Sequence, residues 1–243
     1  MVQMAVSIKT GIVPGEDNLL TRITLRKVII ISFGGILLVI TAYNLWAYQG
    51  TLLIPFTRSL RTDTPHQPLT QVLSEKSISM PIPDLRIEII KSKHVLTIYS
   101  GQLPLKTYTV ALGQDIGSAK GIAGDNKTPE GQYVIVEKTQ YAPPRRFLGD
   151  KLLLLNYPNS NDAYGGFRRG ILTGSDFLAV MKACSELSKP PQSTPLGGDI
   201  SIHGGNGPFM GSSWTNGSAA LYPKDIDELF DTVPVGTKVI IRR

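Results

Sequence analysis

The order of hydrophobic and polar residues divides the chain into three regions. No charged residue occurs from Val28 to Thr57, and the apolar run from Val28 to Tyr48 contains 21 residues. At about 1.5 Å per residue, a helix of this length spans the roughly 30 Å hydrocarbon core of a bilayer. Residues 49–84 carry recurrent prolines without a sustained apolar period. Short segments in which apolar and polar residues alternate follow from Leu85 to the end.

The uncharged run predicts a transmembrane anchor over residues 28–48. Arg22, Arg26 and Lys27 stand directly before it, and the next basic residue after it is Arg58. Because cytoplasmic flanks are enriched in basic residues, residues 1–27 are predicted to be cytoplasmic and the rest of the chain to be periplasmic. The predicted location is therefore the inner membrane, which the protein crosses once.

Two other interpretations of the run fit less well. A cleaved signal peptide has a shorter apolar core of about 7–15 residues and ends at a small-x-small site, whereas Leu45-Trp46-Ala47 is a poor cleavage site. A buried core helix would not need so long an uncharged stretch. The proline-rich residues 49–84 are interpreted as an extended linker, in which a short helix from Leu69 to Lys76 is compatible with the sequence.

Residues 85–243 are predicted to form one mainly β domain. Many short strands with few helices favour a β-sandwich or an open barrel with one or two helices. No internal repeat, Walker phosphate loop or dinucleotide fingerprint occurs in the chain. Strands are predicted over residues 85–90, 94–100, 105–113, 132–138, 151–157, 199–204 and 237–243, and helices over 174–189 and 224–233.

The predicted helix over 174–189 contains the only cysteine of the chain. A single cysteine excludes an internal disulfide, a thiolate zinc site and a CxxC redox pair. Cys184 falls on the predicted apolar face of the helix, so we expect it to be a small buried hydrophobic residue. That face consists of Phe177, Val180, Met181, Cys184 and Leu187, which recur at spacings of three and four.

The chain is basic, with 25 Lys+Arg against 19 Asp+Glu and a formal net charge of +6. The excess is scattered through turns rather than gathered on one helix face. We therefore interpret it as a solvated surface and do not expect a nucleic-acid partner. A weak attraction to an anionic polymer or to a membrane surface stays open.

Of the three histidines, His203 is placed best for chemistry, because it ends an apolar strand just before a glycine-rich loop. His66 in the linker and His94 at a strand start are more typical of surface residues. Farther along, Ser218 follows Gly217 ahead of a predicted helix. Backbone N–H groups at such a position can stabilise an oxyanion. A structural role for His203 remains the alternative when the residue is taken alone.

These residues belong to a set of motifs that resembles the L,D-transpeptidase family, whose periplasmic members cross-link or trim peptidoglycan. The family motif has His-Gly, a variable loop and then Ser/Thr-x-Gly-Cys, and one branch has Trp-Thr-x-Gly-Cys, where this chain has Trp214-Thr215-Asn216-Gly217-Ser218. The similarity extends over about residues 85–243. Further matching pieces occur in the family's order: Gly124 to Gly131 (GDNKTPEG), Tyr157-Pro158-Asn159 with Asp162, Gly197-Gly198-Asp199 leading into Ile202-His203-Gly204, and Val235 to Val239.

The resemblance implies acyl transfer at the L-centre carbonyl of a peptidoglycan stem peptide, to an amine or to water. His203 would be the base, Ser218 would stand at the nucleophile position, and the N–H groups of Gly217 and Ser218 would hold the oxyanion. No metal or organic cofactor is implied. The partners would be stem peptides and, through the N-terminal helix, the inner membrane. The residues expected to contact substrate are Tyr157, Asn159, Gly204, Trp214, Thr215 and Asn216, the first two as part of the cleft wall.

The sequence departs from the family at the nucleophile, where Ser218 replaces cysteine and Cys184 lies on the wrong element to substitute for it. A thiol with a pKa of about 8.5 ionises far more readily than a serine hydroxyl. Three explanations stay open: a weakened natural relative that still binds stem peptides, an active serine enzyme, or deliberate inactivation. Ala219 and Tyr222-Pro223 also differ from the usual pattern, which favours natural divergence. The chain is therefore expected to be either a weakened transpeptidase-type enzyme or a non-catalytic peptidoglycan-binding protein.

Overall fold

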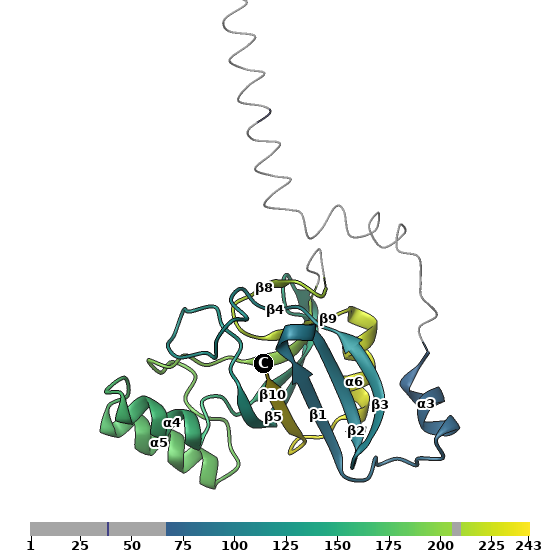
Figure 1. Ribbon diagram of the computed structural model, residues 1–243, viewed down its shortest axis with the longest axis horizontal. Coiled ribbons are helices and arrows are strands. Elements are labelled where there is room, and N and C mark those ends of the chain that lie inside the picture. The colour runs from purple at the N-terminus through teal and green to yellow at the C-terminus, as the bar shows by residue number, and fades with distance from the viewer. Residues whose placement is uncertain (1–37, 39–66, 206–209) are drawn as a thin grey trace, which may run out of the picture. The chain divides into compact units, whose positions relative to one another are not determined.

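The computed structural model describes residues 38, 67–205 and 210–243 of the protein (Figure 1). The chain divides into two compact units, Met1–Leu52 and Leu53–Arg243, and the fold reported below is that of the second. The predicted anchor over 28–48, apart from Leu38, lies outside the described residues, as does the linker up to residue 66. Among the described residues, no helix has the length and apolar character needed to cross a membrane.

The second unit is built on one mixed β-sheet, which confirms the mainly β class. The strand order is β3-β2-β1-β10-β5-β6-β7-β9, with β1–β10 and β7–β9 parallel. A separate two-stranded parallel sheet joins β4 to β8. The strands are β1 (Leu85–Ile90), β2 (Val95–Ser100), β3 (Leu103–Thr109), β4 (Leu112–Gly113), β5 (Gly131–Arg145), β6 (Gly149–Leu155), β7 (Ser201–Gly204), β8 (Ser213–Thr215), β9 (Ala219–Leu221) and β10 (Lys238–Arg242).

Alternation along the strands separates a buried face from an exposed one. In β1, Ile87 and Ile89 are fully buried, whereas Arg86 and Glu88 on the opposite face are not. The buried side chains of β1, β2, β5 and β10 join those of α6 (Pro223–Thr232) in the main hydrophobic core. Figure 1 shows β1, β2 and β3 in front of α6, with no helix on the viewer's side of them. The helix therefore covers one face of these strands and leaves the other open.

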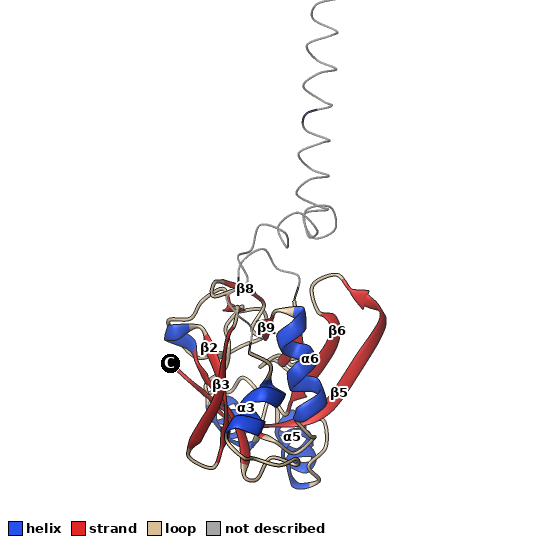
Figure 2. Ribbon diagram, turned by 90° about the vertical axis from the view of Figure 1, so that its right-hand side faces the viewer, coloured by secondary structure: helices blue, strands red, loops and turns tan. Residues whose placement is uncertain are grey.

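The last part of the predicted linker packs against this unit. The short helix α3 (Leu69–Glu75) matches the segment that the sequence marked as compatible with a helix, and Leu69, Val72 and Leu73 are buried in the main core. The backbone N–H of Leu69 donates to Oε1 of Glu228 on α6 at 3.3 Å. Figure 2 shows α3 beside α6. Residues 67–84 are thus part of the compact fold.

Two helices between β6 and β7 form a small satellite core. The sequence analysis missed α4 (Ser160–Arg168), whose paired glycines obscure any helical period, although Asn159 and Asp162 form a capping box at its start. The second helix, α5 (Gly174–Ser185), ends before Leu187. The predicted apolar face is therefore wrong in part, because Met181 and Leu187 are exposed. The satellite core consists of Ala163, Leu172, Val180 and Leu196, with Ile171, Phe177 and half-buried Cys184 against it.

Candidate active site

The parallel pairing of β7 with β9 brings the two predicted catalytic segments together. In its register Ile202 lies beside Ala219 and His203 beside Ala220. Ser218 directly precedes β9 and therefore lies next to Ser201, the first residue of β7. Because side chains alternate along a strand, Ser201 and His203 point to the same face. The sheet thus places the hydroxyl of Ser218 one strand away from the imidazole of His203.

The hydroxyl of Ser218 is held by the start of β7. Its Oγ accepts a hydrogen bond from the backbone N–H of Ser201 at 3.1 Å and lies 3.3 Å from the Oγ of that residue. The same oxygen donates to the carbonyl of Asp199 at 3.3 Å. Among the hydrogen bonds of the described residues, none joins Ser218 to His203. The hydroxyl must therefore rotate, or exchange partners, before the imidazole can take its proton.

His203 is almost completely buried, with 2% of its surface exposed. Desolvation disfavours the charged imidazolium and lowers the pKa of His203 from 6.5 to about 4. The ring is therefore neutral near pH 7 and able to accept a proton, although as a weaker base than an ordinary histidine. Its Nδ1 has no hydrogen-bond partner among the described residues, and the same holds for Nε1 of Trp214. The two rings meet edge to face with centroids 6.4 Å apart.

The turn before Ser218 is closed by the side chain of Thr215. Its Oγ1 donates to the carbonyl of Ser218 at 2.6 Å and accepts the N–H of Gly217 at 3.1 Å. Gly217 has φ +130°, and a Cβ at this position would lie 2.7 Å from the carbonyl oxygen of Lys127. Only glycine fits this turn. The N–H of Gly217, predicted to be an oxyanion donor, is thus engaged by Thr215 in this structure.

The loop between β4 and β5 lies against the turn, where the Lys127 carbonyl faces Gly217. Thr128, in the motif segment Gly124 to Gly131, accepts the N–H of Gly113 on its Oγ1 at 2.9 Å. Nζ of Lys91, a fully buried residue, donates to the carbonyls of Ser118 and Thr128 at 2.8 and 3.1 Å and pairs with Glu130 at 2.8 Å. The sequence analysis missed Lys91, because Lys91-Ser92-Lys93 has the composition of a solvated hairpin turn. No local signal marks the buried lysine.

An aspartate holds the middle of this loop. The carboxylate of Asp125 pairs with Lys120 and accepts the backbone N–H groups of Gly121, Ile122 and Lys127. Burial alone would raise the pKa of Asp125, but these hydrogen bonds favour the charged form more strongly and lower the pKa to about 2. Asp125 therefore stays ionised over the whole range in which the protein is expected to work.

The two predicted cleft-wall residues have structural hydrogen bonds. Tyr157 is 1% exposed, and its hydroxyl donates to the carbonyl of Leu196 at 3.0 Å. Asn159 caps α4 by accepting the N–H groups of Asn161 and Asp162, and its amide donates to the carbonyl of Gln132 at 2.8 Å. These bonds occupy the polar atoms that substrate binding would use. Their role in binding substrate stays a prediction.

The remaining predicted residues are Gly204, Trp214 and Asn216. Gly204 packs so closely on Ile226 of α6 that a side chain would clash, and a Cβ on Gly205 would lie 2.9 Å from the Trp214 ring. Asn216 is exposed, and its Oδ1 accepts from Gln114 at 3.4 Å. Among the residues that the structure describes, no group of His, Cys, Asp and Glu side chains is arranged to hold a metal ion.

The fold and the site define a β-sheet domain in which a buried histidine on one strand lies near a small hydroxyl residue that directly precedes the adjacent strand. Residues 84–241 match the family model of the L,D-transpeptidase catalytic domain, known as YkuD. The match covers well over half of the chain, which therefore belongs to the L,D-transpeptidase catalytic-domain family.

Several solved structures are similar to the chain. Bd1075 of Bdellovibrio bacteriovorus is 19% identical, with a TM-score of 0.45, over 68% of this chain and 49% of that one. The helical cell shape determining protein Pgp2 of Campylobacter jejuni is 19% identical, with a TM-score of 0.45, over 72% and 55%. An L,D-transpeptidase of Mycobacterium tuberculosis is 13% identical, with a TM-score of 0.41, over 66% and 58%. The match spans about half the length of these proteins. A search of curated proteins found no match.

Proposed function

We propose that the protein is a membrane-anchored, periplasmic L,D-transpeptidase-type enzyme that acts on the stem peptides of peptidoglycan, with Ser218 as a weak nucleophile. The observation that carries the proposal is the pairing of β7 with β9, which sets Ser218 next to the strand of the buried, neutral His203. Family membership supplies the substrate class. The uncharged run over residues 28–48 supports the proposed anchor and compartment.

The proposed reaction begins when Oγ of Ser218 attacks the L-centre carbonyl carbon of the stem peptide and its proton passes to the imidazole of His203. The tetrahedral oxyanion then collapses, and the terminal D-alanine leaves with the proton returned by the imidazolium. An ester on Ser218 remains. An amine or a water molecule attacks this ester, gives a proton to His203 and releases the product, while Ser218 recovers its hydrogen.

Two features of the site slow this reaction. Ser218 must break its hydrogen bond to the carbonyl of Asp199, and the N–H of Gly217 must leave Thr215 to bind the oxyanion. One contact helps, because the N–H of Ser201 donates to the attacking oxygen and stabilises negative charge that develops there. Each loss of about 1.4 kcal/mol in transition-state stabilisation lowers the rate tenfold. We therefore expect turnover far below that of a cysteine enzyme.

A second candidate function is a non-catalytic module that binds peptidoglycan stems. The observation that favours it is the network on Ser218, whose hydroxyl is bonded to Ser201 and Asp199 as a structural group would be. In this case the protein would bind stem peptides at this site and would not catalyse acyl transfer.

One assay separates the two candidates. The purified protein is incubated with disaccharide tetrapeptides, and release of D-alanine is followed by mass spectrometry. A serine enzyme predicts slow release that disappears in Ser218→Ala, whereas a binding module predicts no release together with measurable binding to sacculi. Ser218→Cys tests the rest of the site, because the N–H of Ser201 would stabilise a thiolate as it does the hydroxyl oxygen. If Ser218→Cys binds stem peptides and shows no turnover, the catalytic proposal is wrong for this site.

The proposed location has its own test. A reporter that is active only in the periplasm is fused after residue 66, in parallel with one that is active only in the cytoplasm. Activity of the periplasmic reporter alone is expected. Activity of the cytoplasmic reporter, or recovery of the protein in the soluble fraction after cell breakage, would contradict the anchor and its orientation.

A further inference from the structure

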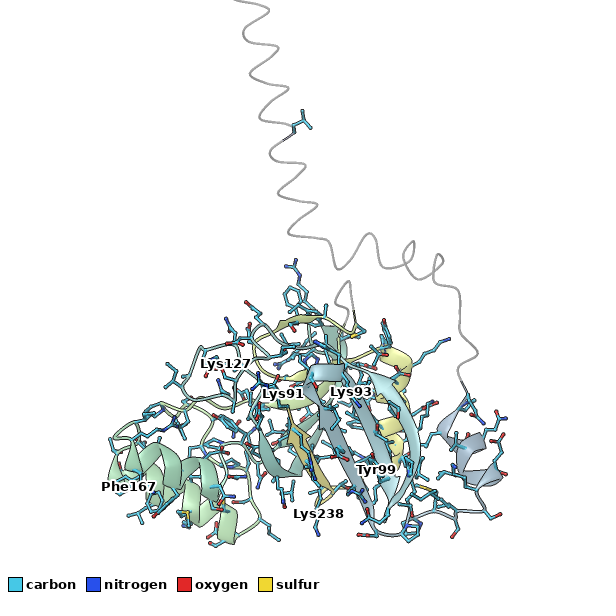
Figure 3. All side chains as sticks on the ribbon, in the orientation of Figure 1. Lys91, Lys93, Tyr99, Lys127, Phe167 and Lys238 are labelled. Atoms are coloured by element: carbon cyan, nitrogen blue, oxygen red, sulfur yellow. The ribbon has the colours of Figure 1, made fainter. Side chains whose placement is uncertain are left out.

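The open face of the large sheet carries a group of cations that the catalytic proposal does not use. We define the outer sheet face by Arg86, Tyr99, Lys238 and Arg242 together with Glu88. Their strand neighbours Ile87, Val239 and Ile241 are buried in the core, so the outward side chains stand on a rigid base. In Figure 3, Tyr99 and Lys238 lie toward the same end of the sheet.

Three residues of this face form a row across three strands. In register, Arg86 of β1 lies beside Tyr99 of β2 on one side and beside Lys238 of β10 on the other. The Arg86 guanidinium lies over the Tyr99 ring, 4.1 Å from its centroid. Among the ion pairs of the described residues, none includes Arg86 or Lys238. Two like charges on neighbouring strands repel each other, and this row has no anion of its own to offset that repulsion.

In the next row, the acidic residue of the face already forms an ion pair. Glu88 pairs with Arg242, with Nε 3.0 Å from Oε1. Thr97, which lies beside Glu88 in register, shares a hydrogen bond of 2.9 Å with the hydroxyl of Thr107 on β3. The face therefore combines two cations that belong to no ion pair of the described residues with a stacked aromatic ring.

We propose that the outer sheet face is a second binding surface that takes a peptidoglycan strand through the carboxylates of its stem peptides. The proposal rests on the proposed function, since it places the same polymer on a surface distinct from the His203 and Ser218 site. Neighbouring strands lie about 4.8 Å apart, and the Arg86 guanidinium leans toward Tyr99 on β2 while Lys238 lies on β10, on the other side of β1. The two cations can therefore meet two neighbouring carboxylates of one polymer strand. Stacking on Tyr99 orders the guanidinium, which then offers its paired donors to a carboxylate.

The shape of the face favours this polymer over a membrane. A membrane-binding surface inserts protruding large apolar side chains into the lipid. The apolar residues on this face of the strands, Ile90, Val95 and Ile240, are half-buried and are smaller than the Phe or Trp that membrane-binding surfaces insert. A sheet face with two cations and a partly exposed aromatic ring suits an anionic sugar-peptide strand better.

The test is sedimentation of the full-length protein with purified sacculi, in mild detergent, at low and high salt. The test variant is Arg86→Gln/Lys238→Gln. The matched control is Lys182→Gln/Lys224→Gln, which also removes two positive charges, from exposed positions on α5 and α6. We expect about fivefold to tenfold weaker binding for the test variant at low salt, with less salt dependence, and under twofold change for the control. Arg86→Lys should restore part of the binding.

Several outcomes would overturn the proposal. One is an equal loss of sacculus binding in the test and control variants. A second is undiminished binding to sacculi after an amidase has removed the stem peptides. A third is binding to phosphatidylglycerol vesicles that depends on Arg86 and is as tight as binding to sacculi. Circular dichroism checks folding, and Lys238→Gln alone replaces the double variant if that fails to fold. D-alanine release by Ser218→Cys from soluble muropeptides should not change when Arg86 and Lys238 are replaced. Sacculus binding that depends on these two residues, without any muropeptide turnover, would defeat the enzyme proposal and leave this one standing.

Discussion

The burial of His203 makes the stability of the protein depend on pH in a predictable direction. The folded protein holds this imidazole at a pKa of about 4, against the ordinary value of 6.5. Between these two values the unfolded chain binds a proton that the folded protein does not, so the free energy of unfolding falls as the pH falls from 6.5 toward 4. Above pH 6.5 both states are neutral at this residue, and the contribution no longer changes.

The size of the effect follows from the shift. A difference of about 2.5 pKa units corresponds to about 3 kcal/mol, of which about 2.5 kcal/mol is lost between pH 7.5 and 4.5. Asp162 acts in the opposite direction, because burial raises its pKa from 3.8 to about 6 despite hydrogen bonds from Asn159 and Tyr133. Its charged form opposes folding, so this group makes the protein more stable as the pH falls through that range. The effect of His203 therefore has to be measured as a difference between two proteins that share Asp162.

The assay compares urea unfolding of the wild type and of His203→Gln from pH 7.5 to 4.5, followed by circular dichroism. The wild type should lose about 2 to 3 kcal/mol more than the variant over this range. Gln102→Ala, at an exposed position without a titratable group, is the control, and its curve should run parallel to that of the wild type. Parallel curves for the wild type and His203→Gln, within about 0.5 kcal/mol, would refute the reasoning and mean that the imidazole is hydrated or protonated in the folded protein.

Three further substitutions test the supports of the site by urea unfolding. Gly217→Ala should lower the free energy of unfolding by about 2 to 3 kcal/mol, because its Cβ meets the Lys127 carbonyl. Gly124→Ala, with φ +74° but open space around it, should lower it by about 1 kcal/mol. Equal losses in the two variants would contradict the steric argument. Lys91→Met leaves two carbonyls and a carboxylate without their donor and should cost about 3 kcal/mol, whereas Lys127→Met, which breaks a partly exposed pair with Asp115, should cost much less. A small loss in Lys91→Met would mean that water replaces the amine. Asn159→Ala removes the cap of α4 and should cost about 1 to 2 kcal/mol, and no measurable change would show that the cap is dispensable.

The strand pattern was predictable because its signal is local. Alternating apolar residues in LRIEII and TKVIIRR mark β1 and β10, and both lie where the pattern places them. The helix α6 follows from its own period and from Pro223 at its start. The helix α4 was missed because it is set by a capping box and by packing of Ala163 and Gly166, and its glycines carry no helical preference.

The candidate site divides in the same way. His203, Gly217 and Ser218 were singled out by position and motif, and the structure brings the two segments onto adjacent strands. The partners of Ser218 were not predictable, because Ser201 and Asp199 lie 17 and 19 positions away along the chain. The protonation of His203 was not predictable either, since it depends on how completely other elements cover the ring.

By itself, the sequence determined the class of fold and the family, and it predicted Ser218 as the residue at the nucleophile position, because each of these depends on local periodicity or on a short motif. Only the tertiary structure decided that Lys91 is buried beneath the loop, that Ser218 is bonded to β7, and that Arg86 and Lys238 share a row on the open sheet face. The physical reason is that desolvation and hydrogen bonding depend on which segments the sheet order brings together. Residues far apart in the chain become neighbours in the sheet, and the sequence of one segment does not predict which segment will pack beside it.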